Sequence, residues 1–258
     1  MMLEDLMSLQ DAVRLLLASV LVVLVVALSR YRGLGLTSDL MVATVRAFAQ
    51  LMVLAFFLTI VFELEDMLWI AAILVFMMVV ASHTSAKRAK DITQGFRVSS
   101  ISIVSSSTAI ILGMIALGVI PMRGEYIIPL GGMVIGNSMN ITSLAMERLR
   151  GEVRNNVLRI ENLLALGATG DQAIRPMIRR SVQASLIPTV DNMRTLGLVW
   201  IPGLMSGMII AGWDPAKAAV FQLIIIFMIL ASNTVASIVS TYLLSRNMFG
   251  RAEELVYR

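Results

Sequence analysis

Long apolar stretches separated by short polar segments constrain this chain more than any other feature of its sequence. A helix needs about 20 mostly apolar residues to cross the hydrocarbon core of a bilayer, with a range of about 17–25. The candidate stretches are Ala12–Ser29, Leu40–Phe62, Met67–Ser82, Val98–Ile120, Ile127–Met146, Gly197–Trp213 and Ala218–Ser245. The third and sixth are short, and the seventh is long enough to tilt or to leave the bilayer. We predict an all-α polytopic membrane protein with about seven transmembrane helices in one domain, residues 1–258.

The composition agrees with this class of protein. Hydrophobic residues make up 58% of the chain and charged residues 15%, whereas soluble domains average roughly 45–50% and about 25%. The absence of cysteine excludes disulfides and thiol chemistry. The first residues, MMLEDLMSLQD, carry three acids and no base, although a secretory signal peptide begins with basic residues. We therefore expect the first apolar stretch to be retained as a helix.

The basic residues predict an orientation, because Lys and Arg gather in cytoplasmic loops. The segments 30–39, 83–97 and 147–196, together with the tail from Arg246, hold seventeen of them. The alternate segments hold only two, Arg123 and Lys217. This difference predicts an amino terminus outside and a carboxyl terminus in the cytoplasm. The net charge of +4 thus reflects the loops, and we expect no nucleic-acid partner.

Arg46 lies six residues into the second apolar stretch, roughly 9 Å deep at about 1.5 Å per residue. Its side chain either snorkels to the interface or pairs with Gln50. Gln50 is four residues further on and therefore shares its helix face. The second alternative places an Arg–Gln pair in the interior of the bundle.

The segment 147–196 is the one long polar piece of the chain. In ERLRGEVRNNVLRIENLLALG, apolar residues recur every three or four positions, which predicts a helix that ends at Gly167. Thr169 followed by Gln172 fits a capping box that opens a second helix, and Pro176 would bend that helix or shift its start. The alternative is a solvated basic helix beside anionic lipid headgroups.

The stretch ENLLALGATGDQAIRP (161–176) resembles the cytoplasmic loop of ABC-transporter permeases, whose pattern is E-A-A, three residues, then G. In that family the glycine permits a sharp turn between two short helices that fit a cleft on the ATPase subunit. Asn162 and Leu163 replace the two alanines here, and the family's I-x-L-P ending is absent. The resemblance implies that five residues couple the chain to an ATPase: Glu161, Gly167, Ala168, Thr169 and Asp171.

Longer stretches resemble the FetB-type family of iron-export ABC transporter permeases, which is related to plant aluminium-tolerance permeases. The stretches are RAFAQL (46–51), IPLGGMVIGNSMN (128–140), LIPTVDNMRTLGLVWIPGLMSG (186–207) and AGWDPAKAAVFQLIIIFMILAS (211–232). The resemblance implies a permease of the plasma (inner) membrane that exports iron or a related metal ion. It also implies two copies of this chain and two cytosolic ATPase subunits. Family members are linked to different cargo, so the cargo is left open.

The chain lacks the phosphate loop G-x-x-x-x-G-K-[ST], so it cannot hydrolyse ATP by the usual machinery. We therefore predict no enzyme activity, no catalytic residue and no cofactor in this chain, with ATP and Mg²⁺ bound by the partner subunit. His83, the sole histidine, has no neighbouring ligands in the sequence. The nineteen methionines mostly lie singly in apolar runs, where they fill space. The metal ligands stay unknown.

Polar groups inside apolar stretches are the candidates for a translocation path, because such groups are costly in lipid. They are Arg46, Gln50, Asn137, Asn140, Asp191, Met205 and Gln222. The alternatives are that Asn137 and Asn140 join helices, together with the Gly132–Gly136 pair, and that Asp191 pairs with Arg194. Gln222 lies eleven residues before Asn233, on the same helix face.

Three other functions fit the same residues. One is an ATP-independent carrier or channel, in which the basic segment only sets the orientation. Another is an ABC permease for a cargo other than a metal. The third is a membrane scaffold that binds a cytosolic partner. Co-purification of a nucleotide-binding subunit would separate the ABC permeases from the other two.

Overall fold

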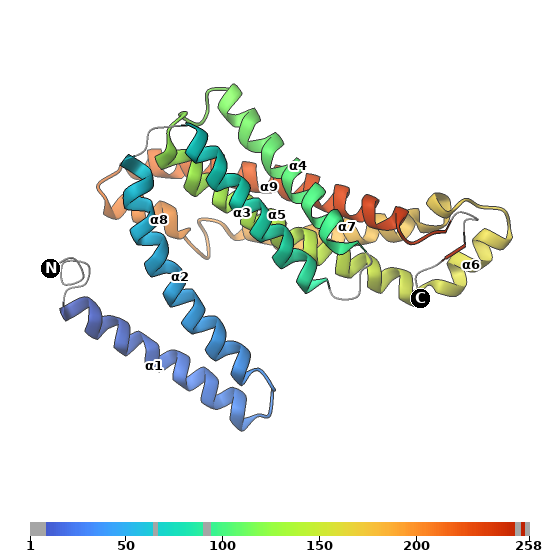
Figure 1. Ribbon diagram of the computed structural model, residues 1–258, viewed down its shortest axis with the longest axis horizontal. Helices are drawn as coiled ribbons and strands as arrows, with labels where there is room; N and C mark the ends of the chain where they lie inside the picture. Colours follow the sequence, from blue (N-terminus) through green and yellow to red (C-terminus); the bar gives the residue numbers. More distant parts are fainter. Residues whose placement is uncertain (1–8, 64–66, 90–93, 251–253, 256–258) are drawn as a thin grey trace. The chain divides into compact units, whose positions relative to one another are not determined.

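The computed structural model describes residues 9–63, 67–89, 94–250 and 254–255, and the chain is helical over almost all of them (Figure 1). The helices are α1 (Leu9–Tyr31), α2 (Thr37–Glu63), α3 (Met67–Arg88), α4 (Gly95–Ala116), α5 (Gly124–Asn155), α6 (Val157–Ala165), α7 (Gly170–Thr195), α8 (Gly203–Ile210) and α9 (Pro215–Arg246). In these residues the only extended pairing consists of isolated bridges. The predicted all-α fold is confirmed.

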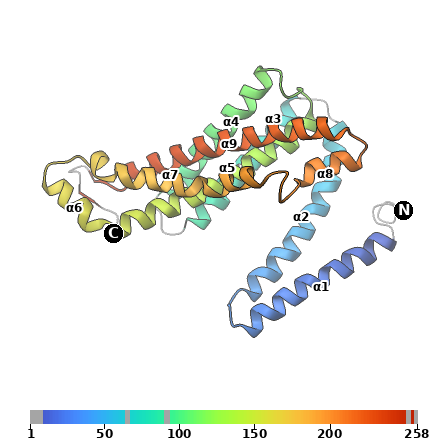
Figure 2. The same ribbon diagram turned by 180° about the vertical axis from the view of Figure 1, so that it is seen from behind.

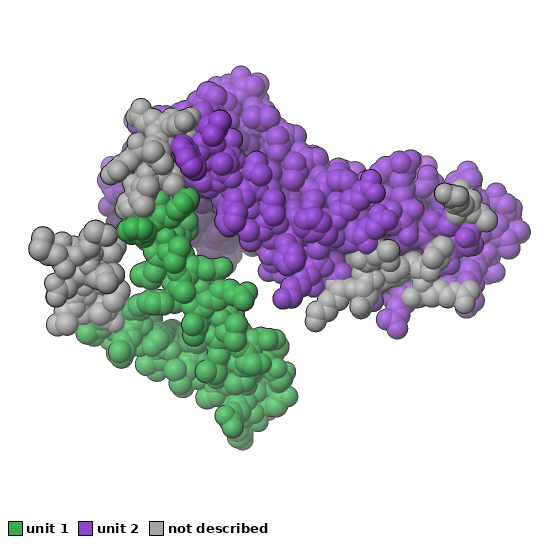
Figure 3. Space-filling view, in the orientation of Figure 1, with its two compact units in different colours: residues 1–64 green, residues 65–258 purple. Residues whose placement is uncertain are grey.

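The chain forms two compact units, coloured separately in Figure 3. Unit 1, Met1–Leu64, contains α1 and α2, and unit 2, Glu65–Arg258, contains α3 to α9. In unit 1 the apolar side chains are exposed almost all round each helix. Such a surface is stable only when lipid or another apolar helix covers it.

Hydrogen bonds between helices fix the directions in unit 2. Ser185 of α7 bonds to Ser237 of α9 at 2.8 Å, and Thr189 accepts from Asn233 at 3.0 Å. The residue numbers rise along α7 while they fall along α9, so these helices are antiparallel.

The hydroxyl of Ser138 in α5 contacts that of Ser232 in α9 at 2.6 Å. One hydrophobic cluster joins Met146 and Leu149, further along α5, to Leu244, further along α9. These two helices are therefore parallel.

The remaining pairs complete a bundle in which α3, α5 and α9 run one way and α4 and α7 run the other. Ser143 of α5 donates to Ser85 of α3 at 3.0 Å, and Ser99 of α4 donates to the same Ser85 at 3.2 Å. The bundle therefore has an α6 end, where α5 finishes and α7 begins, and an α8 end, where α7 finishes and α9 begins (Figures 1 and 2).

Two glycines let α3 and α5 approach closely. A Cβ atom added to Gly131 would lie 2.6 Å from Leu74 Cδ2, and one added to Gly132 would lie 2.9 Å from Met77 Cε. A Cβ atom at Gly136 would meet nothing within 4 Å. Of the two glycines predicted to allow close helix packing, only Gly132 therefore makes such a contact, and Gly131 adds a second.

Among the described residues, five helical segments are long and apolar enough to cross a membrane: Val13–Tyr31, Thr37–Phe57, Met67–Arg88, Gly95–Ala116 and Pro215–Arg246. They agree with five of the predicted stretches. The apolar part of α5, which holds the fifth predicted stretch, is less hydrophobic because it contains asparagines and serines. Polytopic membrane architecture is thus supported, with five candidate spans.

The sixth predicted spanning helix does not form. Residues 196–202 are a loop in which Gly197 has a φ of +74°, and only the eight residues of α8 are helical. Eight residues extend about 12 Å, far less than the roughly 30 Å of a bilayer core. The reason lies in Gly197, Pro202 and Gly203, which favour turns and helix starts over a continuous helix.

Parts of the segments used for the charge comparison lie outside the described residues. These are residues 1–8, 64–66, 90–93, 251–253 and 256–258. The predicted orientation therefore stays a prediction.

Candidate functional site

The turn after α6 is closed by two backbone hydrogen bonds. The N–H of Gly167 donates to the carbonyl of Leu164 at 2.9 Å, and that of Ala168 donates to Leu163 at 3.0 Å. With Gly167 at a φ of +90°, this is the Schellman arrangement that ends many helices. The predicted stop at Gly167 is confirmed.

The next helix begins three residues later with a reciprocal cap. The Thr169 hydroxyl accepts from the Gln172 N–H at 3.3 Å, and the Gln172 side-chain oxygen accepts from the Thr169 N–H at 3.0 Å. The predicted capping box is confirmed. Asp171, exposed in the first turn of α7, suits the positive end of the helix dipole. We call α6, residues 166–169 and the first turns of α7 the hairpin.

The sequence predicted one helix over residues 147–167, and the structure divides it into α5 and α6. Asn156 at the junction has a non-helical φ of −125° and ψ of 22°. Its side-chain amide donates to the carbonyl of Glu152 at 2.7 Å. The asparagine thus satisfies a carbonyl at the helix end, which apolar periodicity alone does not reveal. Pro176, by contrast, is accommodated within α7.

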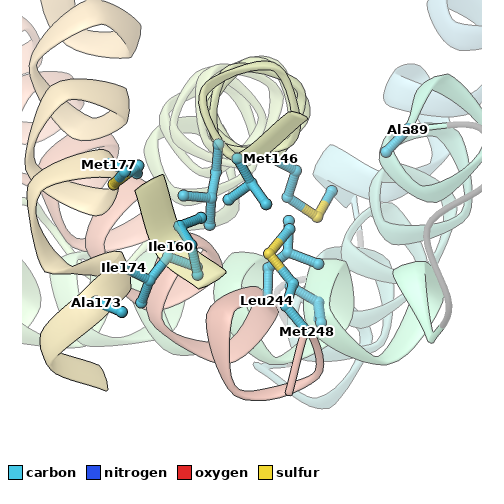
Figure 4. Packing of buried hydrophobic residues seen from close by; sticks show 11 residues of the cluster. Ala89, Met146, Ile160, Ala173, Ile174, Met177, Leu244 and Met248 are labelled. Atoms are coloured by element: carbon cyan, nitrogen blue, oxygen red, sulfur yellow. The ribbon is translucent and has the colours of Figure 1, made fainter. Parts of the chain in front are cut away.

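A buried apolar cluster holds the hairpin to the end of the bundle (Figure 4). Its members come from α4, α5, α6, α7 and the ends of α3 and α9, and several are fully enclosed: Met146, Leu149, Val153, Ile160, Ala173, Ile174, Met177, Leu244 and Met248. Ile160, the buried residue of α6, points into the centre of this cluster. Close packing of this kind makes the hairpin move together with α5, α7 and α9.

The opposite face of α6 carries apolar side chains on its surface. Leu158 is 77% exposed and Leu166 is 84% exposed. Ala165 and Asn162 lie on the same face and are exposed too, while Glu161 beside them is half-buried. An apolar strip at the end of a bundle, on a helix already anchored from behind, has the form of a protein-docking surface.

The interior of unit 2 contains layers of small hydroxyl side chains among its large apolar ones, such as Ile103 and Ile135. In one layer Ser138 contacts Ser232 at 2.6 Å and accepts from Ser106 and Ser107 at 3.3 and 3.4 Å. About five residues closer to the α6 end lie the bonds among Ser85, Ser99 and Ser143 and the Ser185–Ser237 pair. These layers leave no local pattern in the sequence, because the partners are far apart in the chain.

Three residues of the predicted path engage other groups. Asn137 donates to its own helix at Met133 O, 2.8 Å away. The Asn140 oxygen accepts from Arg88 at 2.7 Å, which joins α5 to α3. Asp191 lies exposed in the last turns of α7 and pairs with Arg194 at 3.3 Å. These contacts agree with the alternatives in which Asn140 joins two helices and Asp191 pairs with Arg194.

Gln222 is buried in α9, and its side-chain oxygen has no hydrogen-bond partner. Three turns on, Asn233 is buried on the same face, and its side-chain oxygen is likewise unpartnered. The hydroxyl of Thr142 in α5 is a third buried group without a partner. A buried polar group without a hydrogen bond costs about 1–3 kcal/mol, so these groups suit a water or an ion.

The remaining predicted path residues do not join this set. Met205 is half-buried in α8. Arg46 and Gln50 are exposed on α2 in unit 1, and within the described part of the chain no hydrogen bond joins them. His83 is exposed in α3. Over the described residues no group of three His, Cys, Asp or Glu side chains could hold a metal ion.

A helical chain with five candidate spans and a polar bundle interior is an integral membrane protein. The chain belongs to the family described as Uncharacterised protein family (UPF0014), whose match covers residues 12–249. This confirms the FetB-type family that the sequence motifs indicate, because that family's namesake is among the relatives.

The relatives come from plants and bacteria. The chain is 38% identical over 226 residues to UPF0014 membrane protein STAR2 of Oryza sativa subsp. japonica, which covers 88% of this chain and 79% of that protein. It is 36% identical over 238 residues to Protein ALUMINUM SENSITIVE 3 of Arabidopsis thaliana, with 92% and 87% covered. It is 35% identical over 242 residues to the "Probable iron export permease protein FetB" of Escherichia coli (strain K12), with 94% and 93% covered. No solved structure matches the chain.

Proposed function

We propose that this chain is the membrane-spanning permease subunit of an ABC transporter that exports iron or a related metal ion. A separate cytosolic ATPase subunit binds the hairpin and supplies the energy, so this chain itself is not an enzyme and binds no nucleotide. Two copies of the chain form the pathway. The transporter resides in the plasma (inner) membrane.

The hairpin is the observation that carries this proposal. Its turn is fixed at Gly167 and at Thr169 by the two caps, and its outer face exposes Leu158 and Leu166. The name of the Escherichia coli relative, "Probable iron export permease protein FetB", supports both transport and cargo. Glu161, Ala168 and Asp171 lie in or beside the turn and complete the proposed contact surface.

The apolar cluster behind α6 supports coupling. Because Ile160, Ile174 and Met177 are enclosed in one cluster with residues of α5 and α9, a displacement of the hairpin displaces the ends of these helices as well. Helices that meet through serines have smooth interfaces, and their hydroxyls can rotate to new partners. ATP-driven movement of the hairpin would therefore shift the helices that line the interior.

The contacts support seven crossings with one reassignment. We propose that α7 supplies the sixth crossing, because Ser185 and Thr189 pair with residues inside the apolar part of α9. The polar side chains of α7 lower its hydropathy, so residues 181–195 resemble a loop in sequence. The basic α6 end then faces the cytoplasm, in agreement with the positive-inside rule.

The buried face of α9 is the part of the predicted path that the contacts support best. Gln222 and Asn233 both place an unpartnered amide oxygen there, about 16 Å apart along the helix, and Thr142 adds a hydroxyl. Oxygen ligands suit hard cations such as ferric iron or aluminium better than soft ones. We propose that the cargo passes these oxygens.

The docking proposal is tested by co-purification of the chain with its ATPase subunit. Gly167→Leu puts a branched side chain at a φ of +90° and is expected to abolish pairing, and Glu161→Arg is expected to weaken it strongly. Gly118→Leu is the matched control, because Gly118 closes the same kind of turn after α4 at a φ of +69°, with open space around it, at the α8 end. Loss of pairing in both glycine variants, or in neither, would contradict the proposal.

The cargo is tested by ATP-driven uptake into inverted vesicles with a panel of metal ions. Gln222→Leu and Asn233→Leu are expected to lower metal uptake at least tenfold while leaving the ATPase bound. Asn192→Leu, a change of an exposed amide near the end of α7, should leave uptake intact. Full uptake in both α9 variants would remove this path from the proposal.

A further inference from the structure

A basic groove lies along the outward face of α7. It has a volume of about 620 Å³, within the range of small-ligand pockets. Three arginines and two glutamines line it, together with one proline: Gln172, Arg175, Pro176, Arg179, Arg180 and Gln183. The groove thus presents several N–H donors and no carboxylate.

Two of the three arginines lack an acidic partner. Arg180 lies 3.7 Å from Glu152 of α5, an ion pair that orients it across the edge of the groove. Over the part of the chain that the structure describes, Arg175 and Arg179 form no ion pair. Both side chains are exposed, so their positive charge is available to a ligand.

The register of α7 against α9 indicates at which level of the membrane the groove lies. Counting six residues back from the Ser185–Ser237 pair places Arg179 level with Leu243. The apolar run of α9 ends at this level, because Arg246 follows within a turn. Tyr242 is exposed there, with the Arg246 guanidinium 4.9 Å from its ring centre. Tyrosine and arginine on one turn are typical of a membrane–water interface.

The same face of α7 becomes apolar on its way into the bundle. Ile187 lies one turn beyond Gln183 and is 55% exposed, and Ile238 of α9, nearly level with Gln183, is 51% exposed. The hairpin turn lies in the other direction, nine or more residues before Arg179, which is about 14 Å of helix. The groove therefore adjoins the hairpin at Gln172 and Arg175 and extends from there to the level where headgroups meet acyl chains.

We propose that this groove binds the phosphate headgroup of an anionic phospholipid from the leaflet at the α6 end of the bundle. The guanidinium groups of Arg175 and Arg179 bind phosphate oxygens in pairs, the glutamine amides donate to the remaining oxygens, and the acyl chains lie against Ile187. The inference requires that the chain spans a membrane. It does not depend on the proposed transport activity.

The test uses the purified full chain in detergent, with bound lipids counted by native mass spectrometry. Phosphatidylglycerol is expected to stay bound where phosphatidylcholine does not. The double variant Arg175→Gln/Arg179→Gln should bind phosphatidylglycerol about 30-fold more weakly, or roughly 2 kcal/mol at about 1.4 kcal/mol per tenfold. Arg154→Gln/Arg159→Gln removes the same charge from exposed positions at the end of α5 and in α6 and should bind phosphatidylglycerol like the unchanged chain.

Four outcomes would overturn the proposal. Equal retention of phosphatidylcholine would show that the groove does not select an anionic headgroup, and undiminished binding by the Arg175/Arg179 variant would show that these arginines do not hold it. Millimolar inorganic phosphate that displaces the lipid fully would point to free phosphate as the ligand. Loss of the ATPase subunit with retained lipid, in the Arg175/Arg179 variant alone, would assign the groove to protein docking.

Discussion

The hairpin end of unit 2 and the middle of its bundle differ in how much of their packing is polar. At the hairpin, isoleucine, leucine and methionine side chains from four helices enclose one another completely. In the middle, helices meet through layers of serine hydroxyls, and three buried polar groups have no partner. The first region is built to keep one arrangement, whereas the second tolerates more than one.

This difference suggests that the two regions have different mechanical roles. Interdigitated apolar side chains resist sliding, because every displacement opens cavities. Serine-lined interfaces slide at lower cost, since double-mutant cycles in membrane proteins value such a hydrogen bond at only about 0.6 kcal/mol on average. We interpret the hairpin as the rigid element that receives force and the interior as the part that rearranges.

The comparison is tested most strongly at Ile160, the buried residue of α6. Ile160→Ala removes a fully enclosed side chain and should lower the free energy of unfolding by about 2–4 kcal/mol, because the cluster cannot refill the cavity. Thermal unfolding of the purified chain measures this loss. A loss below about 1 kcal/mol would mean that the cluster does not anchor the hairpin.

Gly131 tests the close contact between α3 and α5. Gly131→Ala places a Cβ atom 2.6 Å from Leu74 and should destabilise the chain by about 1–3 kcal/mol through overpacking. Gly136→Ala is the control in the same helix, because its Cβ atom meets nothing within 4 Å, and it should be neutral or stabilising by up to about 1 kcal/mol. Thermal unfolding of both variants measures these effects. Equal effects on the free energy of unfolding would contradict the close packing of α3 and α5 at Gly131.

The serine layer is expected to respond less. Ser138→Ala should cost about 1 kcal/mol, and its coupling to Ser232→Ala in a double-mutant cycle should be near 0.6 kcal/mol. The cycle is read from thermal unfolding of the four proteins. A coupling above about 2 kcal/mol would show that the middle of the bundle is as firmly specified as the hairpin end.

Leu158 should show the smallest effect on stability. Leu158→Ala changes a side chain that is 77% exposed on α6, so the free energy of unfolding should move by less than about 0.5 kcal/mol. Binding of the ATPase subunit, measured by titration, should nevertheless weaken at least tenfold. Unchanged binding would separate the exposed apolar strip from the docking contact.

The sequence predicted the hairpin well because its signals are local. Gly167 and the pair Thr169–Gln172 lie within six residues, and each acts through its own backbone geometry. Apolar stretches likewise predicted α1 to α4 and α9, since crossing a bilayer demands length and hydropathy alone.

The contacts in the interior of unit 2 could not be predicted from the sequence, for a physical reason. Ser138 and Ser232 lie 94 residues apart, and nothing in either neighbourhood indicates the other. Buried serines and a terminal Asp191–Arg194 pair also make α7 look like a loop, although it packs along α9. The stretch after α7 misled the prediction in the opposite direction. It is apolar enough for a spanning helix, but Gly197 and Pro202 interrupt it and no such helix forms.

The most direct test asks which side of the membrane the hairpin faces. The chain has no cysteine, so Leu158→Cys and Met122→Cys each provide a single exposed thiol, at the α6 end and the α8 end respectively. With a membrane-impermeant maleimide, we expect Leu158→Cys to be labelled only in inverted vesicles, whereas Met122→Cys is labelled in intact cells. Labelling of Leu158→Cys from outside intact cells would contradict the account.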